Sequence, residues 1–138
     1  MSIKLLVVDD HEVVRSGIQT LLEGSDVEIV GAADNVEDTI TLTVAEKPDV
    51  VLLDVRLGGE DGLTALEMIR QKAPEVAVVM MSTYDNPTYV ARAIALGAND
   101  YILKDSSRMD VLEAVHRAAS SEQPSERSIL RRVQATME

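Results

Sequence analysis

The hydrophobic residues of the chain fall into short unbroken runs, which alternate with longer segments where they recur every three or four positions. Unbroken runs are typical of strands buried on both faces of a parallel sheet, and the longer spacing is typical of a helix with one apolar face. Strands are predicted at Lys4–Asp9, Val27–Ala33, Asp49–Asp54, Val76–Met81 and Asn99–Leu103. Helices are predicted at Glu12–Glu23, from residue 34 or 35 to about Glu46, from Leu63 to about Lys72, from Pro87 to near Leu96, and at Arg108–Ala119. The alternation predicts an α/β fold: a doubly wound parallel five-stranded sheet of five βα units, with helices on both faces.

Glycines and prolines mark the expected ends of these elements. Gly24 and Gly97 follow helical segments and are expected to end them. Pro87 suits the first turn of a helix, where its missing N–H costs no hydrogen bond. The glycines between residues 58 and 62 predict a loop after the third strand.

The last part of the chain differs from the repeating units. Residues 1–120 are expected to form one domain, and residues 121–138 a linker or a short C-terminal helix. Apolar residues that would line one side of this helix are Ile129, Leu130, Val133 and Met137. One interpretation is a frayed tail or connector, since termini are often loosely held. The other is a docking or dimerising segment, or the start of a joint to a further module.

Composition narrows the class of protein. A chain of 138 residues with 46% hydrophobic content can bury one core and is short for two domains. The absence of cysteine excludes disulfides and thiol chemistry. A formal net charge of −11 argues against nucleic-acid binding across the whole surface. No apolar run approaches the length of a membrane span, so a soluble, cytoplasmic protein with no membrane role is expected.

Polar residues stand where the predicted strands end. Asp9 and Asp10 end the first strand, Asp54 the third, and Ser82 and Lys104 follow the fourth and fifth. Parallel strands place their carboxyl ends along one edge of the sheet, where open α/β folds build their sites. Three converging carboxylates repel one another unless they share a cation, and carboxylate oxygens are ligands that Mg²⁺ prefers. The pattern predicts a magnesium and phosphoryl site.

Asp54 is the expected reacting group of this site. A carboxylate can attack phosphorus and form an acyl phosphate when neighbouring groups neutralise the phosphoryl oxygens. Lys104 and the metal would provide positive charge, and the Ser82 hydroxyl a hydrogen-bond donor.

With these residues in place, the chain resembles the receiver domain of two-component response regulators over about residues 3–120. The segments VDDHEVVRSG (Val8–Gly17) and GANDYILKD (Gly97–Asp105) are similar in particular to the NarL/FixJ type. The resemblance implies a flavodoxin-like fold and a set of roles. Asp54 would be the phospho-acceptor. Mg²⁺ would be held by Asp9, Asp10, Asp54 and the backbone carbonyl of Arg56. Lys104 would sense the phosphoryl group, and Ser82 and Tyr101 would be the hydroxyl and the aromatic residue that change position on phosphorylation.

The resemblance also implies partners. A sensor histidine kinase would donate the phosphoryl group to Asp54, and the face formed by the fourth helix, fifth strand and fifth helix would change its partner affinity. The resemblance also allows a homodimer that forms on phosphorylation. Output is expected to be transcription, through a helix-turn-helix DNA-binding domain that this chain lacks, so the chain alone should not bind DNA specifically. The alternative is a stand-alone receiver that acts by protein contact.

Two positions depart from the common receiver pattern, and two others are expected to set the lifetime of the phosphorylated state. Gly58 replaces a frequent proline, which predicts a looser loop, and Asp105 replaces a cis proline. Arg56 and Tyr84 stand two residues after Asp54 and Ser82, and their bulk would crowd an attacking water. They are therefore predicted to slow self-dephosphorylation.

Two other classes fit less well. A haloacid-dehalogenase-type phosphohydrolase needs a second aspartate two residues after the first, where this chain has Arg56. A nucleotide-binding flavodoxin-like module needs a phosphate-binding loop after the first strand, where Asp9 and Asp10 would repel phosphate.

Overall fold

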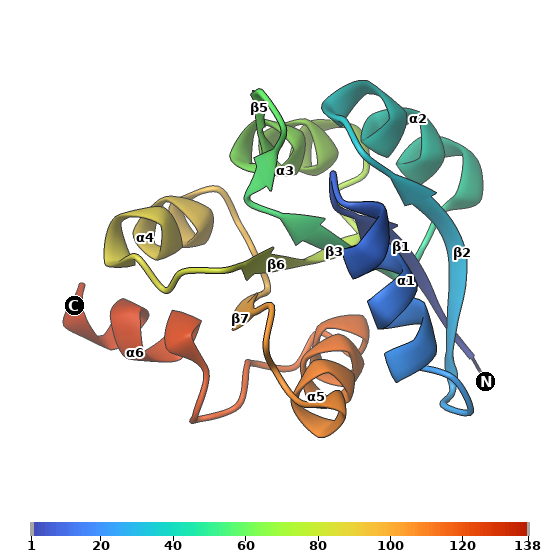
Figure 1. Cartoon of the computed structure of the whole chain (residues 1–138). Coiled ribbons are helices and arrows are strands. Elements are labelled where there is room, and N and C mark those ends of the chain that lie inside the picture. The colour runs from blue at the N-terminus through green and yellow to red at the C-terminus, as the bar shows by residue number, and fades with distance from the viewer. Residues whose placement is uncertain (1, 138) are drawn as a thin grey trace.

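The computed structural model describes residues 2–137 and has one central parallel sheet (Figure 1). Its strands are β1 (Ile3–Val8), β2 (Val27–Ala33), β3 (Val50–Asp54), β6 (Ala77–Ser82) and β7 (Asp100–Leu103). They lie in the order β2-β1-β3-β6-β7, and every pair is parallel. The predicted doubly wound, flavodoxin-like sheet is confirmed. The order reverses at β1 and β3, and such a reversal opens a crevice at the carboxyl ends of the strands.

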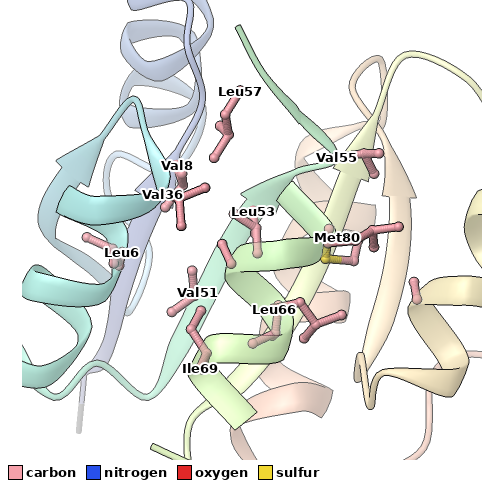
Figure 2. Packing of buried hydrophobic residues seen from close by; sticks show 14 of the residues in the cluster. Leu6, Val8, Val36, Val51, Leu53, Val55, Leu57, Leu66, Ile69 and Met80 are labelled. Carbon is pink, nitrogen blue, oxygen red and sulfur yellow. The ribbon is translucent and has the colours of Figure 1, made fainter. Parts of the chain in front are cut away.

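Helices cover both faces of the sheet (Figure 1). They are α1 (Glu12–Leu21), α2 (Val36–Glu46), α3 (Gly62–Lys72), α4 (Pro87–Ala95), α5 (Arg108–Ala119) and α6 (Ile129–Thr136). Because strand side chains alternate between faces, Leu6 and Val8 join one core cluster with α2, α3, α4 and α6. Leu5 and Val7 join a second with α1 and α5. Figure 2 shows the first cluster, where Leu66 and Ile69 of α3 lie against the sheet.

Several helices begin where capping residues predict. The Asn35 side chain accepts a hydrogen bond from the Asp38 N–H, so Asn35 rather than Asp34 caps α2. Asn86 caps α4 directly before Pro87. Gly97 has φ +90°, a left-handed backbone conformation that favours glycine. None of the helices within residues 2–137 has the length and apolarity that crossing a membrane requires.

The glycine-rich segment after β3 is more regular than the predicted loop. Arg56–Leu57 (β4) pairs antiparallel with Glu60–Asp61 (β5), and Gly58 takes φ +63° in the turn between them. The N–H of Gly58 donates to Asp10 Oδ2 at 2.9 Å. Gly62 begins α3 and is not part of a loop. The predicted loop is therefore a short hairpin whose turn is held by Asp10, and the looser conformation expected from Gly58 stays a prediction.

Arg70 of α3 joins several segments at the opposite edge of the sheet from the acid pair. Its guanidinium donates to the carbonyl of Gly97 at 2.9 Å, to Asn99 Oδ1 at 2.7 Å and to the carbonyl of Val76. Asn99 Oδ1 also accepts from the Val78 N–H. The side chain therefore fixes the connection from α4 to β7 against α3 and β6.

Replacing Arg70 by methionine should lower the free energy of unfolding by about 2 kcal/mol, because the part-buried Val76 carbonyl and Asn99 Oδ1 would lose a charged donor. Urea unfolding measures the change. Lys72→Met, an exposed cation of the same helix, is the control and should change stability little. Equal midpoints for Arg70→Met and wild type would show that these hydrogen bonds contribute nothing net.

Candidate functional site

The carboxyl edge of the sheet brings together the side chains that the sequence placed at strand ends. Asp9 follows β1, Asp54 and Ser82 are the last residues of β3 and β6, and Lys104 follows β7. They meet at a cleft of about 340 Å³ whose lining includes Asp10, Asp54, Ser82 and Lys104. Four separate strands thus contribute to one site.

Lys104 is the centre of the charged cluster. Its Nζ lies 2.8 Å from Asp54 Oδ2 and 2.9 Å from Asp9 Oδ2. The two carboxylates are buried, Asp9 completely. The Lys104 N–H also donates to the Ser82 carbonyl at 2.9 Å, which fixes the backbone that carries the ammonium group. One cation therefore holds two buried carboxylates together.

Burial and charge act in opposite directions on these groups. Burial raises the pKa of Asp54, although hydrogen bonds from Lys104 and the Arg56 N–H favour its charged form. Burial by itself lowers the pKa of Lys104, but hydrogen bonds and charge from Asp54 and Asp9 outweigh it, so this pKa is raised. Lys104 is therefore positively charged at neutral pH. Burial makes the negative charge of Asp54 costly, so this carboxylate benefits from a nearby cation.

The acid pair has an oxygen that suits a cation. Asp9 Oδ1 accepts from the His11 N–H at 2.8 Å. Asp9 Oδ2 is buried and lies 2.9 Å from the Lys104 ammonium, which Asp54 also contacts. A carboxylate oxygen has two lone pairs, so this one can accept from Lys104 and still coordinate a further cation. A carboxylate-rich set with such an oxygen fits a hard divalent cation.

His11 adds a nitrogen to this cluster. Its Nδ1 lies 3.0 Å from Asp10 Oδ1 and 3.4 Å from Asp9 Oδ1. Oxygen and nitrogen atoms of Asp9, Asp10 and His11 lie within 4.8 Å of one another, which permits metal binding. Sequence reasoning did not include His11 among the candidate ligands. Its position directly after the acid pair is the signal that could have done so.

Ser82 and Tyr101 are linked through the backbone of Tyr84. Ser82 Oγ accepts from the Tyr84 N–H at 3.1 Å, and the Tyr101 hydroxyl donates to the Tyr84 carbonyl at 3.1 Å. Tyr101 is only 1% exposed, so its ring points inward. The Tyr84 side chain, by contrast, is exposed at the cleft.

Arg56 connects the site to α4. Its N–H donates to Asp54 Oδ1 at 3.1 Å. Its guanidinium donates to the Tyr89 hydroxyl at 3.3 Å and lies 6.0 Å from the centre of that ring. A second contact joins the hairpin to the same helix, since Arg92 lies 3.6 Å from Asp61. Sequence reasoning missed Tyr89, although Pro87 places it in the first turn of a helix that starts beside the site.

A doubly wound parallel sheet with an aspartate triad and a lysine at its carboxyl edge defines a receiver module of two-component signalling. The family model described as "Response regulator receiver domain" matches residues 5–116. The chain belongs to this family.

Its relatives are response regulators. The chain is 37% identical over 131 residues to the response regulator protein VraR of Staphylococcus saprophyticus, a match that covers 94% of this chain and 63% of that protein. It therefore spans less than two thirds of that relative. It is also similar to the receiver domain of the putative response regulator NarL from Mycobacterium tuberculosis, at 35% identity and a TM-score of 0.81 over 88% of this chain and 98% of that one.

A LuxR-family response regulator from Aurantimonas sp. shares the fold. Its TM-score is 0.89 over 99% of each chain, at 22% identity. The family and the NarL type that the sequence predicted are therefore confirmed.

Proposed function

We propose that this receiver accepts a phosphoryl group on Asp54 from a sensor histidine kinase. The observation that supports this most strongly is the Lys104 ammonium, 2.8 Å from Asp54 and 2.9 Å from Asp9. An Asp54 oxygen would attack phosphorus, the bond from phosphorus to the histidine nitrogen would break, and the imidazole would leave. Lys104 and the Ser82 hydroxyl would then bind phosphoryl oxygens.

Mg²⁺ is the cation proposed for the acid cluster. Asp9, Asp10, Asp54 and the Arg56 carbonyl would hold it, and the nearby His11 nitrogen would remain outside this set, because Mg²⁺ prefers oxygen ligands. When bound, the ion neutralises charge that develops on the transferring phosphoryl group. The contact of Asp10 with the Gly58 N–H fixes the hairpin beside this position.

Phosphorylation would act as a switch for an output. The phosphoryl group adds charge and acceptor oxygens beside Ser82, and α4, β7 and α5 form the face expected to respond. The output proposed is transcription through a DNA-binding domain, with residues 121–138 as the connector to it. The alternative is a receiver that acts by protein contact, and a homodimer formed on phosphorylation fits either output.

Incubation with acetyl phosphate and Mg²⁺, followed by intact-mass measurement, tests the phosphoryl acceptance. Wild type should gain the mass of one phosphoryl group, and chelation of the metal should prevent the gain. Asp54→Ala should gain none. An equal adduct on Asp54→Ala, or none on wild type, would overturn the proposal.

The lifetime of the acyl phosphate should depend on Arg56 and Tyr84, which both line the cleft. Truncating both to alanine should speed the loss of phosphate several-fold, because a water gains access to phosphorus. Phosphate release over time measures the effect. Arg92→Ala is the control, since Arg92 contacts the hairpin but does not line the cleft. An unchanged rate in the double variant would defeat this prediction.

A further inference from the structure

The edge strand β7 is covered by the last helix of the chain. β7 is the final strand in the sheet order, so one of its edges has no neighbouring strand. Helix α6 lies beside α4 and packs on β7 (Figure 1). Leu130 of α6 is buried, at 4% exposure, and Ile129 and Val133 pack against the same core cluster. Helix α6 is thus integrated into the core, although an isolated helix of this length would be marginal in water.

Two hydrogen bonds lead from the residue before α6 to the backbone of Tyr101. The Ser128 hydroxyl, which precedes α6, donates to Asp100 Oδ1 at 2.6 Å. The same oxygen accepts from the Tyr101 N–H at 2.8 Å. Burial raises the pKa of Asp100, and the hydrogen bond from Ser128 opposes that effect. Ser128, the N-cap residue of α6, is therefore hydrogen-bonded to a buried carboxylate, and that carboxylate is hydrogen-bonded to the backbone of Tyr101.

Tyr101 is buried at a position that an edge strand would otherwise leave open. Its ring belongs to the core cluster that includes Leu130. Its hydroxyl is bonded to the Tyr84 carbonyl, two residues beyond Ser82. Tyr101 also lines a cavity of about 230 Å³ together with Ile129 and Arg132 of α6. The docked α6 and the inward Tyr101 therefore occur together in this structure and share one core cluster.

We propose that α6 is a positioning element that holds Tyr101 inward, so that docking of α6 and phosphorylation of Asp54 favour each other. This rests on the proposed function, in which Ser82 moves to the phosphoryl group and an inward Tyr101 fills the space it leaves. Ser128 and Leu130 are positioning residues, because they act on the site only through Asp100 and Tyr101. Coupling between two sites is reciprocal, so each event must strengthen the other by the same factor.

The first test measures the site when α6 is weakened. Affinity for beryllofluoride, a phosphoryl mimic, is measured with Mg²⁺ by calorimetry for wild type, Leu130→Ala and Ser128→Ala. Leu130→Ala should bind about 5-fold more weakly or worse, and Ser128→Ala should shift in the same direction. Gln134→Ala, an exposed residue of the same helix, is the control and should bind as wild type. Thermal unfolding checks that each variant is folded. If Leu130→Ala is unfolded, the beryllofluoride affinity of Ser128→Ala decides the test.

The second test measures α6 when the site is modified. Amide hydrogen exchange of residues 129–136 is followed before and after treatment with acetyl phosphate and Mg²⁺. Exchange should slow by a factor similar to the loss of affinity in Leu130→Ala. Unchanged or faster exchange in protein whose intact mass shows the phosphate would overturn the role of α6 and leave phosphoryl acceptance standing. Unchanged affinity in folded α6 variants would overturn it as well. Absence of a phosphate adduct in wild type would instead remove the proposed function, and with it this inference.

Discussion

Gly62→Ala should unfold far more easily than wild type and accept phosphate poorly. A Cβ on Gly62 would lie 1.9 Å from the Asp54 carbonyl oxygen and 2.9 Å from that of Val55. Both contacts are with backbone, so no side-chain rotation relieves them. Overpacking of this kind costs about 3 kcal/mol. The strain falls on the residue proposed to react, and a displacement of about 1 Å can slow a reaction roughly 100-fold.

Urea unfolding and the initial rate of labelling by acetyl phosphate measure the two effects. Gly59→Ala is a matched control in the preceding hairpin, because a Cβ there would have no atom within 4 Å. Gly59→Ala should therefore resemble wild type in both measurements. If Gly62→Ala keeps wild-type stability and labelling rate, the close approach of α3 to the Asp54 backbone is not as the structure describes.

Lys104→Ala should lower the free energy of unfolding by roughly 3 kcal/mol in the presence of a chelator. The substitution removes the cation that Asp9 and Asp54 share and leaves Asp9 buried with an uncompensated charge. Mg²⁺ should stabilise this variant more than wild type, because it would bind more tightly without the competing ammonium, and ligand stabilisation grows with the logarithm of the affinity for the folded state.

The measurement is urea unfolding with and without Mg²⁺. Lys72→Ala removes an exposed lysine and should change neither stability nor its dependence on Mg²⁺. A Lys104→Ala protein as stable as wild type in chelator would show that the shared cation is not needed to keep the carboxylates buried.

The candidate site could be predicted from the sequence because parallel topology alone brings strand ends together. Asp9, Asp54, Ser82 and Lys104 each follow an apolar run, and no knowledge of loop conformation is needed to place them at one edge. The starts of α2 and α4 could also be predicted, because they depend on capping residues next to them in the sequence. Asn35 and Pro87 act on their own backbone neighbourhood, so a local pattern is sufficient.

What the sequence did not predict depends on contacts between distant segments. The β4–β5 hairpin forms where Asp10 accepts from Gly58, 48 residues away. The contact of Arg56 with Tyr89 joins the β4–β5 hairpin to α4 of the next βα unit. The docking of α6, which the sequence left open as one of two interpretations, depends on the burial of Leu130 and on the part-buried hydrogen bond from Ser128 to Asp100. These pairings are set by tertiary packing, which hydrophobic periodicity does not encode.

Localising the phosphoryl group in the chain is the most direct test that Asp54 accepts it. Wild-type protein is treated with acetyl phosphate and Mg²⁺, reduced with borohydride to convert any aspartyl phosphate to homoserine, digested and sequenced by mass spectrometry. Homoserine is expected at position 54 alone. Homoserine at Asp9 or Asp10, or none in the chain, would contradict this expectation.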